Sequence, residues 1–153
     1  METLEPILAR HPFFQGLDPR HLALIVSCAS NVRFAAGEFL FRAGEDANVF
    51  FLVREGHVAI EIVPPGVPPH TVQTIGAGDV IGWSWLVPPY RWKFDAHARE
   101  DTRAVALDGL CLRGKCEADH DLGYELLKRV ARVMEERLQA ARLQLLDVYG
   151  ARG

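Results

Sequence analysis

The residues best suited to ligand chemistry lie in one stretch, from position 78 to position 98. The stretch opens on Gly78-Asp79-Val80-Ile81-Gly82, whose glycines let backbone N–H groups approach an anion. Indole rings and basic side chains follow, and they could stack on a planar ligand and neutralise its charge. Ser84 and the Gly82 amide would serve as polar anchors. The candidate ligand-binding residues here are Gly82, Trp83, Ser84, Trp85, Arg91, Trp92 and Lys93.

The same aromatic cluster has a structural interpretation. Aromatic side chains in β structure belong to the core more often than to a binding site, and Pro88-Pro89 would fix the loop. Strand alternation would place Arg91 and Lys93 on one face and the rings of Trp92 and Phe94 on the other. Rings packed inward would exclude a ligand, whereas rings around an open cavity with Arg91 facing in would admit one.

Catalysis and metal binding find less support in the sequence. Ser84 lacks the second glycine of a nucleophile elbow, and no acids are paired at catalytic spacing, so no enzyme is predicted. Cys116 and His120 are four residues apart, but with Cys111 they fall short of a cluster's ligand set. His97 is the better haem-ligand candidate, although such a histidine ordinarily has a hydrogen-bonding role. No metal site is predicted.

Composition indicates one domain over residues 1–153, with 49% hydrophobic residues and a formal charge of −3. No basic field is present to hold a phosphate backbone, so direct nucleic-acid binding is not expected. No apolar run approaches the ~20 residues of a membrane span, which predicts a soluble, cytoplasmic protein without membrane contact. Cys28, Cys111 and Cys116 are too few for a disulfide framework, and we expect reduced thiols.

The predicted elements place the candidate site inside a β roll. Residues 1–30 form a helical lead-in, with Asp18 able to cap a second helix. Residues 31–108 carry short, glycine-punctuated β runs typical of a double-stranded β-helix or jelly roll. Within them, residues 50–63 are predicted to form a hairpin, and residues 64–69 an exposed loop. The fold class is therefore α+β, mainly β, with N-terminal helices and a long C-terminal helix.

Residues 109–150 are predicted to form a hinge and that long helix, with Asp119 or Asp121 capping it. Its apolar residues recur at spacings of three, four and seven, as in a coiled-coil seam. This pattern favours a homodimer; the alternative is that the face packs only on its own barrel. The predicted seam residues are Leu127, Val130, Met134, Ala141, Leu145 and Val148.

Motifs along nearly the whole chain resemble the cyclic-nucleotide-binding domain of the Crp/Fnr superfamily. They are residues 34–45 (FAAGEFLFRAGE), residues 50–53 (FFLV), residues 56–58 (GHV) and residues 76–82 (GAGDVIG). The chain looks most like small single-domain bacterial members with the signature GWSWL-x-PPYRW-x-FDA-x-A. The resemblance implies a regulatory domain in which ligand biases the hinge at residues 119–123. A helix-turn-helix commonly follows in this family, and because this chain stops at Gly153, output through a partner protein or a dimer interface is expected.

The resemblance also implies a phosphate cassette whose Gly-Glu pair accepts a ribose hydroxyl and whose arginine clamps a cyclic phosphate. Gly82 matches the glycine, but Trp83 stands at the glutamate position and Trp92 nearest the arginine. A one-residue shift could bring Arg91 into the pocket. On the final helix, Ala141 and Arg142 stand where the family places a base-contacting Thr-Ser pair, which adds Arg142 to the candidates.

These substitutions favour a ligand other than ordinary cyclic AMP, so no cofactor is predicted beyond a cyclic nucleotide or another small ligand. The runner-up is a ligand-free dimeric interaction module with an aromatic-filled pocket. In that module the long helix or the loop at residues 64–69 would engage a protein partner.

Overall fold

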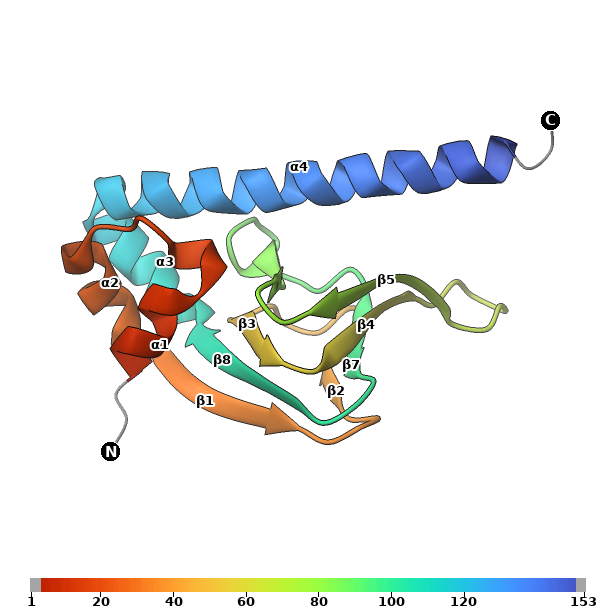
Figure 1. Cartoon of the computed structure of the whole chain (residues 1–153), viewed down its shortest axis with the longest axis horizontal. Coiled ribbons are helices and arrows are strands. Elements are labelled where there is room, and N and C mark those ends of the chain that lie inside the picture. Colours follow the sequence, from red (N-terminus) through yellow and green to blue (C-terminus); the bar gives the residue numbers. More distant parts are fainter. Residues whose placement is uncertain (1–3, 151–153) are drawn as a thin grey trace.

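Two four-stranded antiparallel sheets form a β roll, and helices cover one end and one side of it (Figure 1). The computed structural model describes residues 4–150. One sheet has the strand order β1-β8-β3-β6 and the other β2-β7-β4-β5. The elements are α1 (Leu4–Arg10), η1 (Pro12–Phe14), α2 (Pro19–Val26), β1 (Ala29–Phe34), β2 (Phe39–Phe41), β3 (Val49–Glu55), β4 (His57–Ile62), β5 (His70–Gly76), β6 (Val80–Ile81), η2 (Trp83–Trp85), β7 (Asp95–Ala98), β8 (Thr102–Asp108), α3 (Gly109–Ala118) and α4 (His120–Gly150). The predicted fold class is confirmed.

The N-terminal helices begin as their sequence predicts. Asp18 accepts a hydrogen bond from the Arg20 backbone N–H at 2.8 Å, and Pro19 occupies the first position of α2. Proline fits there because that N–H has no partner within the helix. The short η1 turn is fixed to the roll by His11, whose Nε2 lies 3.1 Å from the Val53 carbonyl oxygen. Burial lowers the pKa of His11, which keeps the ring neutral.

The hairpin predicted for residues 50–63 is wrong, although both of its strands exist. β3 pairs with β6 and β8, whereas β4 pairs with β5 and β7 in the other sheet. Gly56 forms the corner between the sheets with φ +94°, where a Cβ atom would lie 2.5 Å from Thr102 Oγ1. Only glycine fits so close to β8 in this conformation. Apolar alternation does not reveal such a crossing because both strands bury their inner faces.

Two apolar clusters make up the core. The first lies between the helices and the β1-β8-β3-β6 sheet, and it holds Phe14, Phe50, Trp85, Leu112 and Leu126. The second fills the inside of the roll, and it holds Phe41, Phe51, Val58, Ile81 and Trp92. The aromatic stretch that the sequence singles out therefore contributes one tryptophan to each cluster.

A disulfide joins Cys28 to Cys111, so the expectation of reduced thiols is wrong for these two residues. Cys28 precedes β1 and Cys111 lies in the first turn of α3, with Cα atoms 5.7 Å apart. Their separation of 83 residues hides this proximity, because it arises only when β8 returns alongside β1. Cys116 is free, and burial raises the pKa of its thiol to about 11, with Glu117 and Asp119 adding to the effect.

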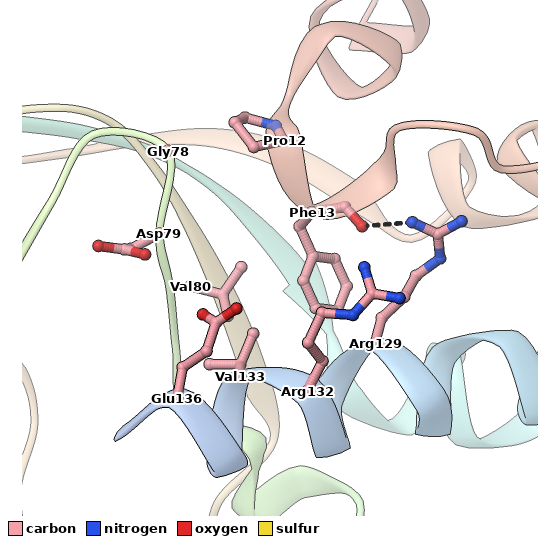
Figure 2. Close-up of a pocket in the computed structure, with 9 residues that line it drawn as sticks. All are labelled: Pro12, Phe13, Gly78, Asp79, Val80, Arg129, Arg132, Val133 and Glu136. Atoms are coloured by element: carbon pink, nitrogen blue, oxygen red, sulfur yellow. Dashed lines mark hydrogen bonds between the residues drawn. The ribbon is translucent and has the colours of Figure 1, made fainter. Parts of the chain in front are cut away.

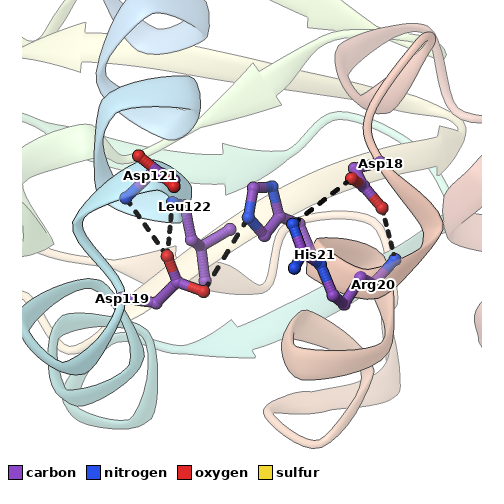
Figure 3. A network of polar contacts seen from close by, with 6 residues as sticks. All are labelled: Asp18, Arg20, His21, Asp119, Asp121 and Leu122. Carbon is purple, nitrogen blue, oxygen red and sulfur yellow. Dashed lines mark hydrogen bonds and ion pairs between the residues drawn. The ribbon is translucent and has the colours of Figure 1, made fainter.

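The hinge before α4 lies beside α2 (Figure 3). Asp119 Oδ1 accepts hydrogen bonds from the backbone N–H groups of Asp121 and Leu122 at 3.1 and 3.2 Å, which caps the helix. Asp119 Oδ2 lies 3.8 Å from Nε2 of the buried His21. The helix break predicted at residues 119–123 therefore lies beside α2, with Asp119 capping α4.

The 31-residue helix α4 buries Leu122, Leu126 and Val130 against the domain in its first turns and then runs along the roll (Figure 1). Val130 is 2% exposed and belongs to the first apolar cluster, so it faces the domain's own core and is not part of an exposed seam. From Ala131 to Asp147 most side chains are exposed. Within residues 4–150, no helix combines the length and the apolar character that crossing a membrane requires.

Reducing the Cys28–Cys111 disulfide is expected to lower the free energy of unfolding by about 2–4 kcal/mol, because the unfolded chain regains the freedom of a long loop. Urea titration with and without dithiothreitol measures the change. Cys116→Ser is the control, since it should keep the full effect of the reductant. Identical midpoints with and without reductant, in wild type, would contradict the prediction.

Candidate functional site

The cassette, defined as residues 78–98, contains a tight turn at Gly82, directly after β6. Gly82 has φ +92° and precedes the 3-10 turn η2. A Cβ atom on Gly82 would lie 2.6 Å from Cη2 of Trp92. The glycine is required both for the left-handed conformation and for the indole ring that lies on it.

Trp92 fills the inside of the roll. Its ring stacks on Phe41 with centroids 3.8 Å apart and planes inclined by 11°, and the residue is 4% exposed. Phe94 is half-buried beside it, with its centroid 5.6 Å from Phe41. The position nearest the family's phosphate-binding arginine therefore carries an apolar side chain that occupies the interior.

Arg91 and Lys93 lie on the outside. The Arg91 guanidinium donates to the Gly44 carbonyl oxygen at 3.1 Å and lies 3.2 Å from Asp46 Oδ1. Residues 91–94 form no regular strand beyond an isolated bridge between Asp46 and Arg91, yet the side chains alternate as the sequence predicts. Neither cation points into the roll.

The remaining cassette candidates face the helices. Trp85 is fully buried in the first apolar cluster, with its ring centroid 5.7 Å from Phe50, while Trp83 and Ser84 are half-buried. Arg113 of α3 donates to the Trp85 carbonyl oxygen at 2.6 Å and lies over the Tyr90 ring at 4.1 Å. This contact ties α3 to the cassette. No feature of the sequence singles out Arg113.

A groove of about 470 Å³ separates the β4–β5 hairpin from α4. It is hereafter called the α4 groove, and its size falls within the range of ~300–1,000 Å³ common for small-molecule sites. Ala141 lines it, whereas the exposed Arg142, a predicted ligand contact, is not among its lining residues. The lining residues are Ile62, Val72, Gln73, Arg137, Ala140, Ala141, Gln144 and Leu145.

Arg137 is the cation of the α4 groove. Its guanidinium donates to the Val80 carbonyl oxygen and lies over the Trp83 ring, 4.8 Å from the centroid. Burial lowers the pKa of Arg137 to about 10, while Asp79 and Glu136 act in the opposite direction. The sequence prediction omitted Arg137, which lies four residues before Ala141 on the same helix.

A smaller cleft of about 240 Å³ lies between η1, the turn before β6 and α4 (Figure 2). Arg129 donates to the carbonyl oxygens of Phe13 and Gln15 at 2.8 and 2.9 Å, which fastens α4 to the N-terminal segment. Asp79 and Glu136 line this cleft together with Arg129 and Arg132, so acidic and basic groups balance. The cleft offers no uncompensated charge to a ligand.

His97 has a structural partner rather than a free ring. Its Nε2 contacts the Glu61 carboxylate on the adjacent strand β4, and the ring lies beside that of Phe39. In the part of the chain that the structure describes, no group of three or more histidine, cysteine, aspartate or glutamate side chains is arranged to hold a metal.

Comparison with known proteins agrees with this architecture. The family model described as "Cyclic nucleotide-binding domain" matches residues 31–119. A crystal structure from Geobacter metallireducens, of a candidate cyclic nucleotide-binding protein, is 28% identical and has a TM-score of 0.80, covering 90% of this chain and 99% of its own. The catabolite activator protein of Thermus thermophilus is 25% identical with a TM-score of 0.70, covering 91% of this chain and 63% of its own.

A curated relative extends beyond the matched region. The "CRP-like cAMP-activated global transcriptional regulator" of Mycobacterium tuberculosis is 26% identical over 145 residues, which are 95% of this chain. The match spans 63% of that relative's length.

Trp92→Ala is expected to lower the free energy of unfolding by about 3–5 kcal/mol, because it removes a stacked ring from a closed interior. Urea titration followed by circular dichroism measures the loss. Lys93→Ala, at the exposed neighbouring position, is the matched control and should change stability by at most about 0.5 kcal/mol. A Trp92→Ala loss no larger than the control's would show that the ring does not fill the interior.

Proposed function

The chain belongs to the cyclic nucleotide-binding domain family, and we propose that it acts as a sensory domain that takes a small ligand in the α4 groove and signals through α4. The observation that carries this proposal is the α4 groove itself, which lies between the β4–β5 hairpin and the long helix. A molecule seated there would contact both elements at once.

We propose that the ligand does not bind in the manner that the family resemblance implies. Position 83 carries an indole, which cannot accept a hydrogen bond as a carboxylate does. Arg91 is engaged outside the roll by Asp46, and Trp92 occupies the interior. These substitutions remove the two charged contacts of the cassette, and they support a ligand other than ordinary cyclic AMP.

Signal output would use the hinge at Asp119. Two arginine contacts hold α4 to the rest of the domain beyond its first turns, from Arg129 to the N-terminal segment and from Arg137 to Val80. A ligand that bridges the β4–β5 hairpin and α4 would favour one angle of the helix over others. The formal charge of −3 supports output through protein contacts rather than through direct contact of this domain with DNA.

The output surface we propose is a homodimer seam on α4. An exposed stripe follows alternating spacings of three and four residues, the heptad pattern of a two-helix coiled coil. Ala131 takes the place of the buried Val130 in this register, and the predicted seam residue Val148 lies outside the side chains that the structure describes. The stripe comprises Tyr124, Leu127, Ala131, Met134, Leu138, Ala141 and Leu145.

The filled roll favours one alternative function. With Trp92 stacked between Gly82 and Phe41, the domain would serve as a ligand-free dimeric interaction module. The exposed loop at residues 64–69 or the α4 stripe would then engage a protein partner. The two functions differ in whether a small molecule enters the α4 groove.

Isothermal titration with cyclic AMP and cyclic GMP tests the ligand proposal. We expect weak binding, with a dissociation constant of roughly 10 µM to 1 mM, because the cassette's two charged contacts are missing. Arg91→Ala should leave the affinity within about twofold of wild type, since Arg91 faces Asp46 and not the groove. Circular dichroism confirms that the variant is folded.

Two results would contradict this expectation. Tight binding that Arg91→Ala abolishes would mean that Arg91 turns inward and restores the phosphate clamp. Absence of heat with either nucleotide would remove cyclic nucleotides as ligands and favour the interaction module.

If α4 forms the dimer seam, a charged side chain on its apolar stripe should dissociate the dimer. Leu138 is 53% exposed on the stripe, and Leu138→Glu would place like charges across a two-fold seam. We expect a dimer for the wild type and a monomer for this variant, measured by size-exclusion chromatography with light scattering. Leu143→Glu is the matched control, because Leu143 is 54% exposed on the opposite side of the heptad. A monomeric wild type, or equal effects of both variants, would exclude the seam.

A further inference from the structure

Arg137 is a largely buried cation without a carboxylate partner. Among residues 4–147, no aspartate or glutamate oxygen lies within 4.0 Å of its guanidinium, whereas Arg33 and Arg91 pair with Asp101 and Asp46. A guanidinium carries several N–H donors, and among the described residues the one side-chain hydrogen bond of Arg137 goes to the Val80 carbonyl oxygen. Much of its hydrogen-bonding capacity is left for another group.

This arrangement costs free energy. Water is withdrawn from the guanidinium, and burial accordingly lowers its pKa to about 10. Asp79 and Glu136 compensate in part, but both are exposed side chains that act from a distance. Buried charges ordinarily have a direct partner of opposite sign, so an unpaired one beside a groove indicates a place for an anion.

Trp83 explains why the partner is missing. The family resemblance places a glutamate at position 83, where a carboxylate would give Arg137 an acidic neighbour. In this chain the neighbour is an indole ring that offers its π face, 4.8 Å from the guanidinium carbon to the ring centroid. A cation–π contact leaves the charge un-neutralised, and the negative charge must come from elsewhere.

The other residues that line the α4 groove indicate the shape of the molecule that would supply this negative charge. Ile62, Val72 and Leu145 provide apolar walls, and the small Ala140 and Ala141 leave room beside α4. Gln73 and Gln144 add one amide on each side, which can both donate and accept. Such a lining suits a flat, largely apolar body with a few polar edge atoms.

We propose that Arg137 is the anion-binding residue of the α4 groove and that its ligand is a planar, largely apolar molecule with one anionic group. The phosphodiester of a cyclic nucleotide and the carboxylate of an aromatic acid share this chemistry. In either case the charged group docks against α4 and Trp83 rather than inside the roll, which Trp92 occupies. The inference rests on the proposed function in that both need a ligand in this groove.

Matched pairs of charged and neutral probes test the proposal. Cyclic AMP is compared with adenosine, and indole-3-acetate with indole-3-acetamide, by isothermal titration and by the change in tryptophan fluorescence. We expect the charged member of at least one pair to bind tenfold or more tightly than its neutral counterpart. Arg137→Gln should reduce that preference to less than threefold, because the charge-assisted contact is lost.

Two further variants separate charge from folding. Arg137→Lys keeps the positive charge and should retain most of the preference even if the contact with Val80 is weakened. Arg132→Gln removes an exposed arginine from the same helix and should leave the preference unchanged. Thermal unfolding by circular dichroism establishes that each variant is folded at the temperature of the titration.

The outcomes distinguish this inference from the proposed function. Binding of cyclic AMP with a preference over adenosine that survives Arg137→Gln would overturn the role of Arg137 and leave the sensory function standing. An Arg137-dependent preference for indole-3-acetate, without binding of either cyclic nucleotide, would support the anion site and remove the cyclic nucleotides as ligands. Equal affinities within both pairs, or no binding of any probe to folded wild type, would overturn the inference.

Discussion

The contact between Gly82 and Trp92 is the constraint on which the site depends. The indole ring lies directly on the glycine and stacks on Phe41, so the turn, the ring and β2 are fixed together. Any side chain at position 82 would displace the ring, and a smaller residue at position 92 would leave a cavity in the roll. Because this packing fills the interior, the charged groups around it take other positions, with Arg91 outside against Asp46 and Arg137 approaching from α4.

The sequence predicts the order of elements well because local signals dominate there. Asp18 and Asp119 act as helix caps as expected, and the glycine-punctuated β runs form the predicted roll. The predictions that failed concern contacts between distant segments. β3 and β4 share a hairpin-like pattern but enter different sheets at Gly56, and Cys28 meets Cys111 only after β8 returns beside β1. The spacing of apolar residues predicts which face of an element is buried, but it does not predict which element packs against that face.

In the candidate site too, the features that depend on local sequence are predicted, and those that depend on contacts between distant segments are not. The resemblance locates the cassette, and strand alternation predicts that Arg91 and Trp92 point to opposite sides, because alternation is a short-range property of the chain. Arg113 and Arg137 escape sequence reasoning, since an arginine on an amphipathic helix ordinarily belongs to its solvated face. Their importance comes from what lies opposite: the Trp85 carbonyl oxygen and Tyr90 ring for Arg113, and the Val80 carbonyl oxygen and Trp83 ring for Arg137. Only the tertiary fold supplies those neighbours.

The position of the α4 groove gives a physical reason for coupling ligand to assembly. Ala141 and Leu145 line the groove and also belong to the exposed heptad stripe. A molecule in the groove would alter the angle and the solvation of the same turns that a second α4 would cover. By linkage, a ligand that favours the dimer must bind the dimer more tightly, and by the same factor. Both responses would act at the hinge at Asp119, and the contacts that Arg129 and Arg137 make would change with the angle of α4.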